Sequence, residues 1–210
     1  MFRSRISASA LRLPGLVLCS LFVLAGLLAA AQSQGPASAA HQCQLLTLDG
    51  ELVGALDDLV AQNAAATVFV FTRTDCPIAN RYMPQLAKLS QQFADRGVRL
   101  TLVYPDGDES ASKIQQHLTD FGHPPHALRD ANHSLVELCQ AKVTPEAAVF
   151  LPSGKLAYLG PIDDRYAGYG QARAKATRPF LLAAVEAVLA GEQAPAAGCA
   201  AVGCPISPLH

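Results

Sequence analysis

The residues best suited to chemistry in this chain gather around Cys76. Pro77 follows it directly, and Arg73 stands three positions before it. A cysteine attacks as its thiolate, and nearby positive charge lowers the pKa of the thiol. We therefore take Cys76 as a candidate redox nucleophile, with Thr74 and Asp75 as supporting residues beside it. The competing interpretation is that Cys76 is only a small buried residue.

The elements on either side of Cys76 place it where a thiolate is favoured. The β-branched and aromatic run ATVFVF, residues 66–71, predicts a strand buried on both faces. Apolar residues at helical spacing predict a long helix after Pro77, with Pro84 inside it and Gly97 beyond its end. Exposed N–H groups and the positive end of the helix dipole would favour a thiolate at Cys76.

The remaining pattern predicts an α/β domain. Further strands are expected at 43–48, 98–104, 126–128, 147–151 and 156–159, and further helices at 110–121, 134–140 and 177–190. Residues 52–61 are expected to form a short amphipathic segment. Strands joined by a crossover helix lie parallel with a right-handed connection, whereas the last two strands form an antiparallel hairpin. The expected fold is therefore a three-layer α/β/α sandwich with a mixed sheet that ends in a hairpin.

The N-terminal residues have the pattern of an export signal. Arg3, Arg5 and Arg12 precede an uncharged apolar run, 16–31, and small residues follow. This run is shorter than the roughly 20 residues that span a membrane, so a retained anchor is the weaker alternative. We expect residues 1–40 to be a signal peptide and linker, 41–190 to be the folded domain, and 191–210 to be a cysteine-containing tail. The expected location is periplasmic or secreted, without a stable membrane anchor.

Composition narrows the classes of partner. The net charge is −1 and no basic patch stands out, which argues against nucleic acid as a partner.

Export would leave five cysteines in a compartment where disulfides persist: Cys43, Cys76, Cys139, Cys199 and Cys204. Because this number is odd, at least one thiol has no disulfide partner within the chain.

Two motifs in this order resemble the thioredoxin superfamily, namely Cys76-Pro77 after a buried strand and Val143-Thr144-Pro145 before a hairpin. Longer strings resemble exported bacterial redoxins of the alkyl hydroperoxide reductase and thiol-specific antioxidant (AhpC/TSA) family, and they lie at 74–82, 143–146, 162–166 and 202–204. The resemblance spans roughly residues 44–206. It implies a thioredoxin-like fold with a cis Thr144–Pro145 peptide bond that faces Cys76.

The resemblance also implies a function. It predicts an oxidoreductase that needs no cofactor. The substrate is either a disulfide in a client protein, as for a thiol-disulfide oxidoreductase, or a peroxide, as for a thiol peroxidase. In both cases an external thiol reductant would restore the oxidised protein.

Topology brings one more segment to the expected site. The second strand of the hairpin returns to the sheet edge that holds Cys76, so residues 160–166 should lie near the thiol. Arg165 is a candidate to steady a thiolate, and Asp163 or Asp164 to move a proton or to hold Arg165 in place. The alternative for the two aspartates is a helix-capping, solvated loop.

The sequence departs from the standard mechanisms of these families. Ala79 occupies the second cysteine position of a Cys-x-x-Cys motif, and Arg73 and Phe69 occupy the peroxiredoxin Thr and Pro positions. A resolving thiol could come from elsewhere in the chain or from an external molecule. Cys204 is our candidate because the ending Val-Gly-Cys-x-Ile resembles the exported redoxins. About a dozen extended residues can span up to roughly 40 Å, so chain length does not exclude contact between Cys204 and Cys76. A local disulfide between Cys199 and Cys204 is the alternative.

The remaining cysteines allow other interpretations. Cys139 is expected on an apolar helix face as a buried structural thiol, and Cys43 as an arm thiol with Cys199 as a candidate partner. Copper-delivery proteins of the Sco type share the expected fold, but Thr72 stands where their second cysteine ligand would be. Cys199 and Cys204 could form half of a soft-metal site. We assign no metal ligand, and a non-enzymatic copper-binding or interaction module is the alternative to an enzyme.

Overall fold

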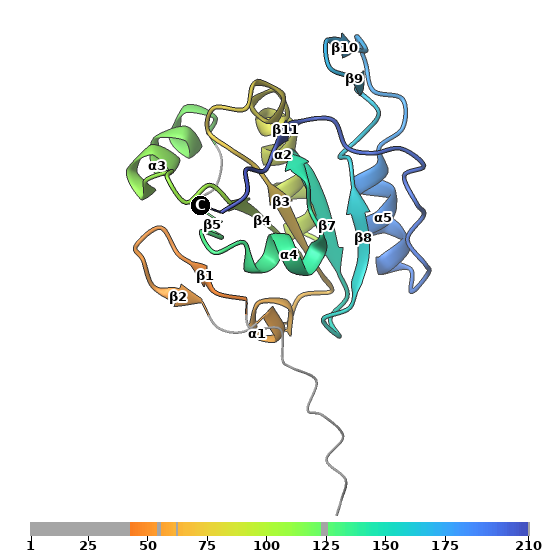
Figure 1. Cartoon of the computed structure of the whole chain (residues 1–210). Helices are drawn as coiled ribbons and strands as arrows, with labels where there is room; N and C mark the ends of the chain where they lie inside the picture. The colour runs from red at the N-terminus through yellow and green to blue at the C-terminus, as the bar shows by residue number, and fades with distance from the viewer. Residues whose placement is uncertain (1–42, 54–55, 62, 123–125, 210) are drawn as a thin grey trace, which may run out of the picture. The chain divides into compact units, whose positions relative to one another are not determined.

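The computed structural model describes residues 43–209 except 54–55, 62 and 123–125. The expected signal peptide and linker, residues 1–40, lie outside the described residues. The described residues build one seven-stranded sheet that is covered by helices on both faces (Figure 1).

The sheet is mixed and ends in the expected hairpin. In their order across the sheet, its strands are β2 (Leu52–Val53), β1 (Leu45–Leu46), β5 (Ala127–Arg129), β4 (Val98–Tyr104), β3 (Ala66–Phe71), β7 (Glu146–Phe150) and β8 (Leu156–Gly160). β3, β4 and β5 are parallel, because helical crossovers connect them. β7 is antiparallel to both β3 and β8, and the last two strands form the hairpin.

Five helices form the outer layers. They are α1 (Leu56–Ala61), α2 (Pro77–Ala94), α3 (Ala111–Asp120), α4 (Ser134–Cys139) and α5 (Phe180–Leu189). On one face of β3, Val68 and Val70 join an apolar core with α2, α3 and α5. On the other face, Phe69 and Phe71 join a second core with α1 and α4. The alternation along β3 therefore produces the three layers.

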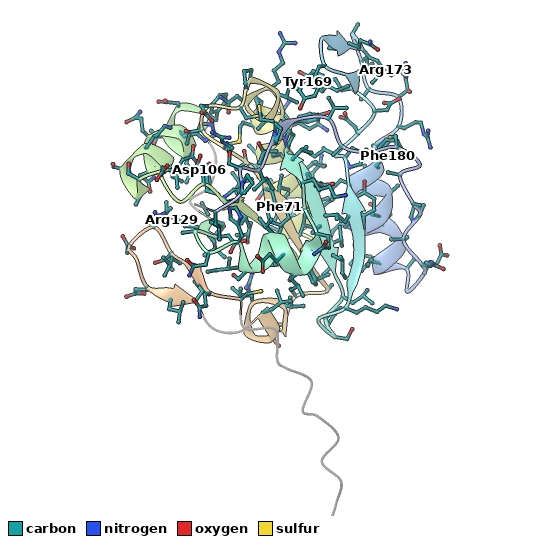
Figure 2. All side chains as sticks on the ribbon, viewed as in Figure 1. Phe71, Asp106, Arg129, Tyr169, Arg173 and Phe180 are labelled. Carbon is teal, nitrogen blue, oxygen red and sulfur yellow. The ribbon has the colours of Figure 1, made fainter. Side chains whose placement is uncertain are left out.

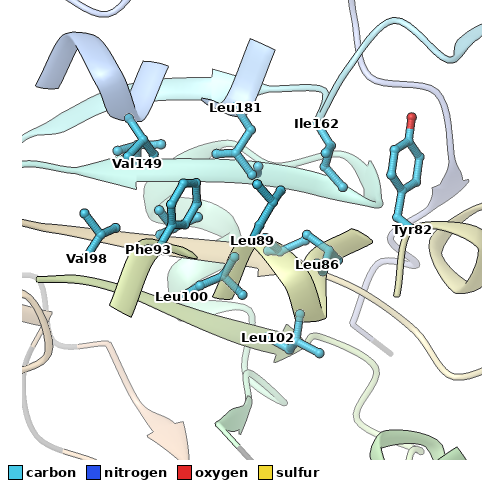
Figure 3. Packing of buried hydrophobic residues seen from close by; sticks show 14 of the residues in the cluster. Tyr82, Leu86, Leu89, Phe93, Val98, Leu100, Leu102, Val149, Ile162 and Leu181 are labelled. Atoms are coloured by element: carbon cyan, nitrogen blue, oxygen red, sulfur yellow. The ribbon is translucent and has the colours of Figure 1, made fainter. Parts of the chain in front are cut away.

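The packing of α2 fixes the position of its N-terminus. Figure 3 shows Leu86, Leu89 and Phe93 of α2 close to Leu100 of β4 and Leu181 of α5. All five side chains are buried, and each contributes about 1.5–3 kcal/mol to folding. The helix continues through Pro84 without interruption. Cys76, directly before α2, is thus attached to a helix that is packed firmly into the core.

The fold predicted from the sequence is confirmed, while several of its elements differ in their bounds. The expected strand 43–48 is reduced to β1. The segment 52–61, expected as one amphipathic segment, divides into β2 and α1. The last helix begins at Phe180 and not at Thr177, because the N–H groups of Thr177 and Arg178 donate to Asp164 and hold this segment in a loop.

Two small sheets have no counterpart in the sequence analysis. One pairs β9 (Tyr166–Gly168) with β10 (Gln171–Ala172), and the other pairs β6 (Val143–Thr144) with β11 (Cys204–Pro205). Figure 1 shows the C-terminal tail, in dark blue, running from α5 to β11 beside the N-terminal end of α2. The end of the tail is therefore paired with β6.

Candidate active site at the start of α2

Cys76 is the N-cap residue of α2, and its side chain is fully buried. Its Sγ accepts a hydrogen bond from the backbone N–H of Ala79 at 3.4 Å. Pro77 occupies the first turn of the helix. Backbone N–H groups in the first turn have no acceptor within the helix, so the N–H that proline lacks is not needed there. The position expected for Cys76 at the strand–helix junction is confirmed, and the helix directs an N–H group at its sulfur.

Thr144 lies beside the same thiol. The thiol of Cys76 donates to the carbonyl oxygen of Thr144, with 3.0 Å between Sγ and oxygen. Thr144 is fully buried, and its peptide bond to Pro145 is cis, as the family resemblance implied. The Cys76 sulfur therefore lies between the start of α2 and the backbone of β6.

The C-terminal tail brings Cys204 to the same place. β11 pairs antiparallel with β6, and Cys204 lies opposite Thr144. The N–H of Ile206 extends this ladder by donating to the carbonyl oxygen of Lys142 at 3.0 Å. The Thr144 hydroxyl also donates to the carbonyl oxygen of Cys204 at 3.4 Å. Thr144 thus contacts both Cys76 and Cys204.

The environment acts in opposite directions on the two thiols. Burial raises the pKa of Cys76, but hydrogen bonds from the Cys204 side chain and from the N–H groups of Ala79 and Cys204 outweigh it and lower the pKa overall. The pKa of Cys204 is raised to about 11 by burial, by its hydrogen bond to Cys76 and by the negative charge there. Of the pair, Cys76 is therefore the thiol that ionises more readily.

Arg73 acts on the tail cysteine, which differs from the expected role beside Cys76. Its guanidinium pairs with the carboxylates of Asp75 at 3.1 Å and Asp106 at 3.2 Å. Its charge counteracts burial and lowers the pKa of Cys204. Arg73 is not among the groups with the largest effects on the pKa of Cys76. Asp75 is half exposed and holds the guanidinium in this position.

Thr74 is held by residues that the sequence analysis did not single out. Its N–H donates to Oε1 of the buried Glu109 at 2.8 Å, and its hydroxyl donates to the same oxygen. Its carbonyl oxygen accepts from the side-chain amide of Asn80 at 2.9 Å. Because that amide donates, Asn80 Oδ1 must accept from His117 Nε2, 2.8 Å away. His117 Nδ1 then accepts from the Tyr104 hydroxyl at 2.9 Å.

The residues that hold Thr74 come from different parts of the chain, which is why the sequence alone did not indicate all of them. Asn80 lies in the string 74–82 that carried the resemblance, so a signal for it was present. Glu109 and His117 come from the loop and helix after β4, and no local pattern connects them to Cys76. They reach the site because parallel β3 and β4 end at the same sheet edge.

Asp163 and Arg165 are tied to α2. Asp163 accepts hydrogen bonds from the Tyr82 hydroxyl at 2.6 Å and from the Gln85 amide at 3.1 Å, and it also accepts from the backbone N–H of Arg165. The Arg165 guanidinium lies over the Tyr82 ring, 5.5 Å from its centroid. Neither residue forms a hydrogen bond or ion pair with Cys76 within the described structure. Asp163 therefore holds the Arg165 segment in place, and the expected contact of Arg165 with the thiolate is not formed.

Asp164 holds the loop that precedes α5, and it does not cap that helix, whose N-cap residue is Pro179. It accepts from the hydroxyl and N–H of Thr177 at 2.7 Å each and from the N–H of Arg178 at 2.9 Å. Together with the charge of Arg173, these hydrogen bonds lower the pKa of Asp164 to about 2, the Thr177 hydroxyl having the largest effect. A carboxyl group with so low a pKa is a poor proton carrier near neutral pH.

The other cysteines lie away from this pair. Cys139 is buried in the second core, as expected, and burial strongly raises the pKa of its thiol. Cys199 is exposed, and its thiol is free, as are those of Cys76 and Cys204. Within the described ranges, no three His, Cys, Asp or Glu side chains converge as a metal site. No helix in the described part of the chain is long and apolar enough to cross a membrane.

Comparison with known sequences gives one family. The AhpC/TSA family model matches residues 36–159, which is more than half of the chain. The matched range includes Cys76, Thr144 and Pro145, and it ends before Asp163 and Cys204. No curated protein matches the chain significantly.

Solved structures share the fold. A hypothetical protein from Sinorhizobium meliloti is 24% identical with a TM-score of 0.66, covering 77% of this chain and 88% of that chain. An uncharacterized conserved protein from Geobacillus kaustophilus is 23% identical with a TM-score of 0.66, covering 80% and 90%. A secreted disulfide oxidoreductase from Mycobacterium tuberculosis is 15% identical with a TM-score of 0.50, covering 74% and 99%. At these identities the likeness concerns the fold.

Proposed function

The chain belongs to the AhpC/TSA family, and from this premise we propose that it is an exported thiol-disulfide oxidoreductase with Cys76 as nucleophile and Cys204 as resolving thiol. The family and the thioredoxin-like fold support redox activity of this general kind. One observation carries the specific assignment. Both cysteines contact Thr144, and their surroundings lower the pKa of one thiol and raise that of the other.

The first step is attack by the Cys76 thiolate on one sulfur of a client disulfide. A bond forms between Cys76 and that sulfur, and the other client sulfur leaves as a thiolate that takes a proton. The Ala79 N–H stabilises the attacking thiolate before the step. Because Cys76 is fully buried, the tail strand must move aside to admit the client.

The second step uses Cys204. Its thiolate attacks the Cys76 sulfur, the Cys76–Cys204 disulfide forms, and the client leaves as a second thiolate that takes a proton. Once Cys76 is bound to the client it no longer carries the negative charge that raises the pKa of Cys204. The charge of Arg73 still acts to lower that pKa, so the Cys204 thiol ionises more readily at this step than in the resting protein. Two electrons have then passed from the two cysteines to the client. An external thiol reductant supplies two electrons that reduce the Cys76–Cys204 disulfide.

This scheme explains how Ala79 can replace the usual second cysteine. Its backbone N–H still contacts Cys76, while the second sulfur comes from the tail. The supporting residues of the first loop have separate tasks in the proposal. Thr74 fixes the approach of the chain to Cys76 through Glu109, and Asp75 holds Arg73 near Cys204.

The full burial of Cys76 favours a second candidate, a thiol peroxidase. A small hydroperoxide could reach the sulfur with less movement of the tail than a protein. The thiolate would attack the terminal peroxide oxygen, forming a sulfenic acid and releasing water or an alcohol. Cys204 would then condense with the sulfenic acid, releasing water and forming the same disulfide.

Export remains part of the proposal. The basic and apolar residues of 1–40 have the pattern of a signal peptide, and a periplasmic or secreted location would suit a protein that exchanges disulfides. We propose 41–190 as the redoxin domain and 191–210 as the tail that carries the resolving thiol.

The experiment compares the parent with Cys76→Ser, Cys204→Ser and the control Cys199→Ser. Insulin disulfide reduction, hydrogen peroxide consumption and copper binding are measured for each protein. We expect both thiol activities to disappear in Cys76→Ser, and Cys204→Ser to stop at a mixed disulfide. The Cys199→Ser variant should resemble the parent. If the parent exceeds Cys76→Ser in neither thiol activity, the enzyme proposal is wrong, and copper binding lost in Cys76→Ser would favour the metal-binding alternative.

A further inference from the structure

Gly203, directly before Cys204, packs against the turn that contains the cis bond. A Cβ atom at this position would lie 2.1 Å from the carbonyl oxygen of Thr144, 2.5 Å from its carbonyl carbon and 3.0 Å from the nitrogen of Pro145. These separations are far below the optimal contact distance of about 3.5–4.0 Å. All three atoms belong to the backbone, so they cannot rotate aside as a side chain can. The site therefore has room only for glycine.

A second contact fixes the same residue. The hydroxyl of Tyr169 donates to the carbonyl oxygen of Gly203. Tyr169, labelled in Figure 2, comes from the turn between β9 and β10 and is 65% exposed. The turn between β9 and β10 therefore holds the backbone of Gly203, in addition to β6. This places the next residue, Cys204, opposite Thr144 and within reach of Cys76.

The docking itself uses backbone groups. The ladder between β6 and β11 consists of main-chain pairing, which any extended segment can provide. A cysteine opposite Thr144 then places its sulfur beside Cys76. The steric limit applies to the residue before that cysteine, because its Cβ would meet the Thr144 carbonyl. Main-chain pairing with β6 would therefore provide the affinity for a docked strand, and the residue before its cysteine would determine which strands fit.

We propose that the edge of β6 is a strand-docking site that admits a cysteine to Cys76 only when glycine precedes it. Gly203-Cys204 of the tail is the resident occupant, and a client disulfide whose cysteine follows a glycine is the preferred substrate class. This inference rests on the proposed function, since it states which cysteines exchange with Cys76. Gly203 is accordingly a positioning residue, and it touches no reacting atom.

The first test acts on the tail. Gly203→Ala is compared with Gly107→Ala, a matched control whose Cβ would meet nothing nearer than 3.7 Å. The azo oxidant diamide takes two electrons from a thiol pair, and mass spectrometry follows formation of the Cys76–Cys204 disulfide. We expect Gly203→Ala to form it about tenfold more slowly or worse, as an overpacked methyl group would cause. The pH midpoint for alkylation of Cys76 should also rise, because the hydrogen bond from Cys204 is lost.

The second test presents the strand in trans. A variant with Gly203→Val, Cys204→Ser and Cys199→Ser has an excluded tail and no thiol on it. It is mixed with the peptides Val-Gly-Cys-Pro-Ile and Val-Ala-Cys-Pro-Ile, each a mixed disulfide with thionitrobenzoate. Attack by Cys76 forms the Cys76–peptide bond and releases coloured thionitrobenzoate. We expect the glycine peptide to react about tenfold faster or more, with mass mapping to confirm the bonded residue.

The outcomes separate this inference from the function on which it rests. If both peptides react at the same rate, or if Gly203→Ala forms the disulfide as fast as the parent, the glycine requirement is overturned. If the parent itself forms no Cys76–Cys204 disulfide, the resolving role of Cys204 is wrong. In that event the peptide comparison still decides the selectivity of the β6 edge, since it uses only Cys76. Circular dichroism of each variant confirms that the domain is folded.

Discussion

Cys204 lies opposite Thr144 in the ladder between β6 and β11, and the carbonyl oxygen of Thr144 accepts the hydrogen bond of the Cys76 thiol. One residue of β6 thereby aligns two cysteines that are far apart in the chain. In a Cys-x-x-Cys motif the two sulfurs are neighbours because they share one helical turn. Here strand pairing makes them neighbours, so the second sulfur can leave with the tail.

The alkylation of Cys76 should begin at lower pH than that of an ordinary cysteine. Only the thiolate reacts, and the hydrogen bonds to Cys76 lower its pKa despite burial. The rate therefore rises with pH through a window below the ordinary midpoint of about 8.5. Iodoacetamide labelling across pH, mapped by mass spectrometry, gives the native midpoint. The same measurement in urea is the control, and a native midpoint at or above the unfolded one would contradict the lowered pKa.

Cys204→Ala should move the alkylation midpoint of Cys76 to higher pH. The substitution removes the thiol whose hydrogen bond makes the largest contribution to lowering this pKa. A client-derived mixed disulfide at Cys76 should also accumulate, because no second thiol resolves it. Cys199→Ala is the control, since Cys199 is exposed and free. An unchanged midpoint in Cys204→Ala would mean that the tail thiol does not act on Cys76 in solution.

Glu109→Ala should destabilise the domain by about 1–3 kcal/mol, the cost of leaving buried donors without an acceptor. It removes the carboxylate that accepts from the N–H and hydroxyl of Thr74. Lys113→Ala is the matched control, because its exposed side chain only pairs with Glu109 at 3.7 Å. That loss should cost less than about 1 kcal/mol. Urea unfolding measures both, and equal losses would refute the supporting role of Glu109.

Asp163→Asn should lower stability without changing the chemistry of Cys76. The buried carboxylate accepts from Tyr82, Gln85 and the N–H of Arg165, and loss of charge-assisted hydrogen bonds costs about 1.5–3 kcal/mol. Thermal or urea unfolding measures this loss. The pH profile of Cys76 alkylation should remain that of the parent. A displaced profile would show that Asp163 acts on the thiol, as the topology first suggested.

Cys139 should resist alkylation in the folded protein at pH values where Cys199 reacts at once. Burial strongly raises the pKa of the Cys139 thiol, which lies within the second core. Cys76, by contrast, has a lowered pKa and lies beside the tail strand, which moves aside in the proposed reaction. Cys199 in the same sample is the internal control, because it is exposed. Peptide mapping after brief labelling measures both, and Cys139 should become labelled only in denaturant. Rapid labelling of Cys139 in the native protein would contradict its burial.

Local sequence patterns were sufficient for most of the fold. The run 66–71 and the run 98–104 became β3 and β4 with the expected bounds, because buried parallel strands require continuous apolar residues. The helix after Cys76 also began where Pro77 indicated. Patterns failed where short segments depend on remote partners. The division of 52–61 and the pairing of β6 with β11 are set by contacts with other parts of the chain.

Some features of the active site likewise follow from local sequence, whereas others depend on contacts between distant parts of the chain. By itself the sequence determined the position of Cys76, since a strand run, a cysteine and a proline in succession define a helix start locally. Only the tertiary structure decided that Arg73 acts on Cys204, that Asp163 is tied to α2, and that Glu109 supports Thr74. It also brought Cys204 opposite Thr144. The physical reason is that hydrogen bonds and charge effects depend on distances of a few ångströms, and for residues far apart in the chain folding alone sets those distances.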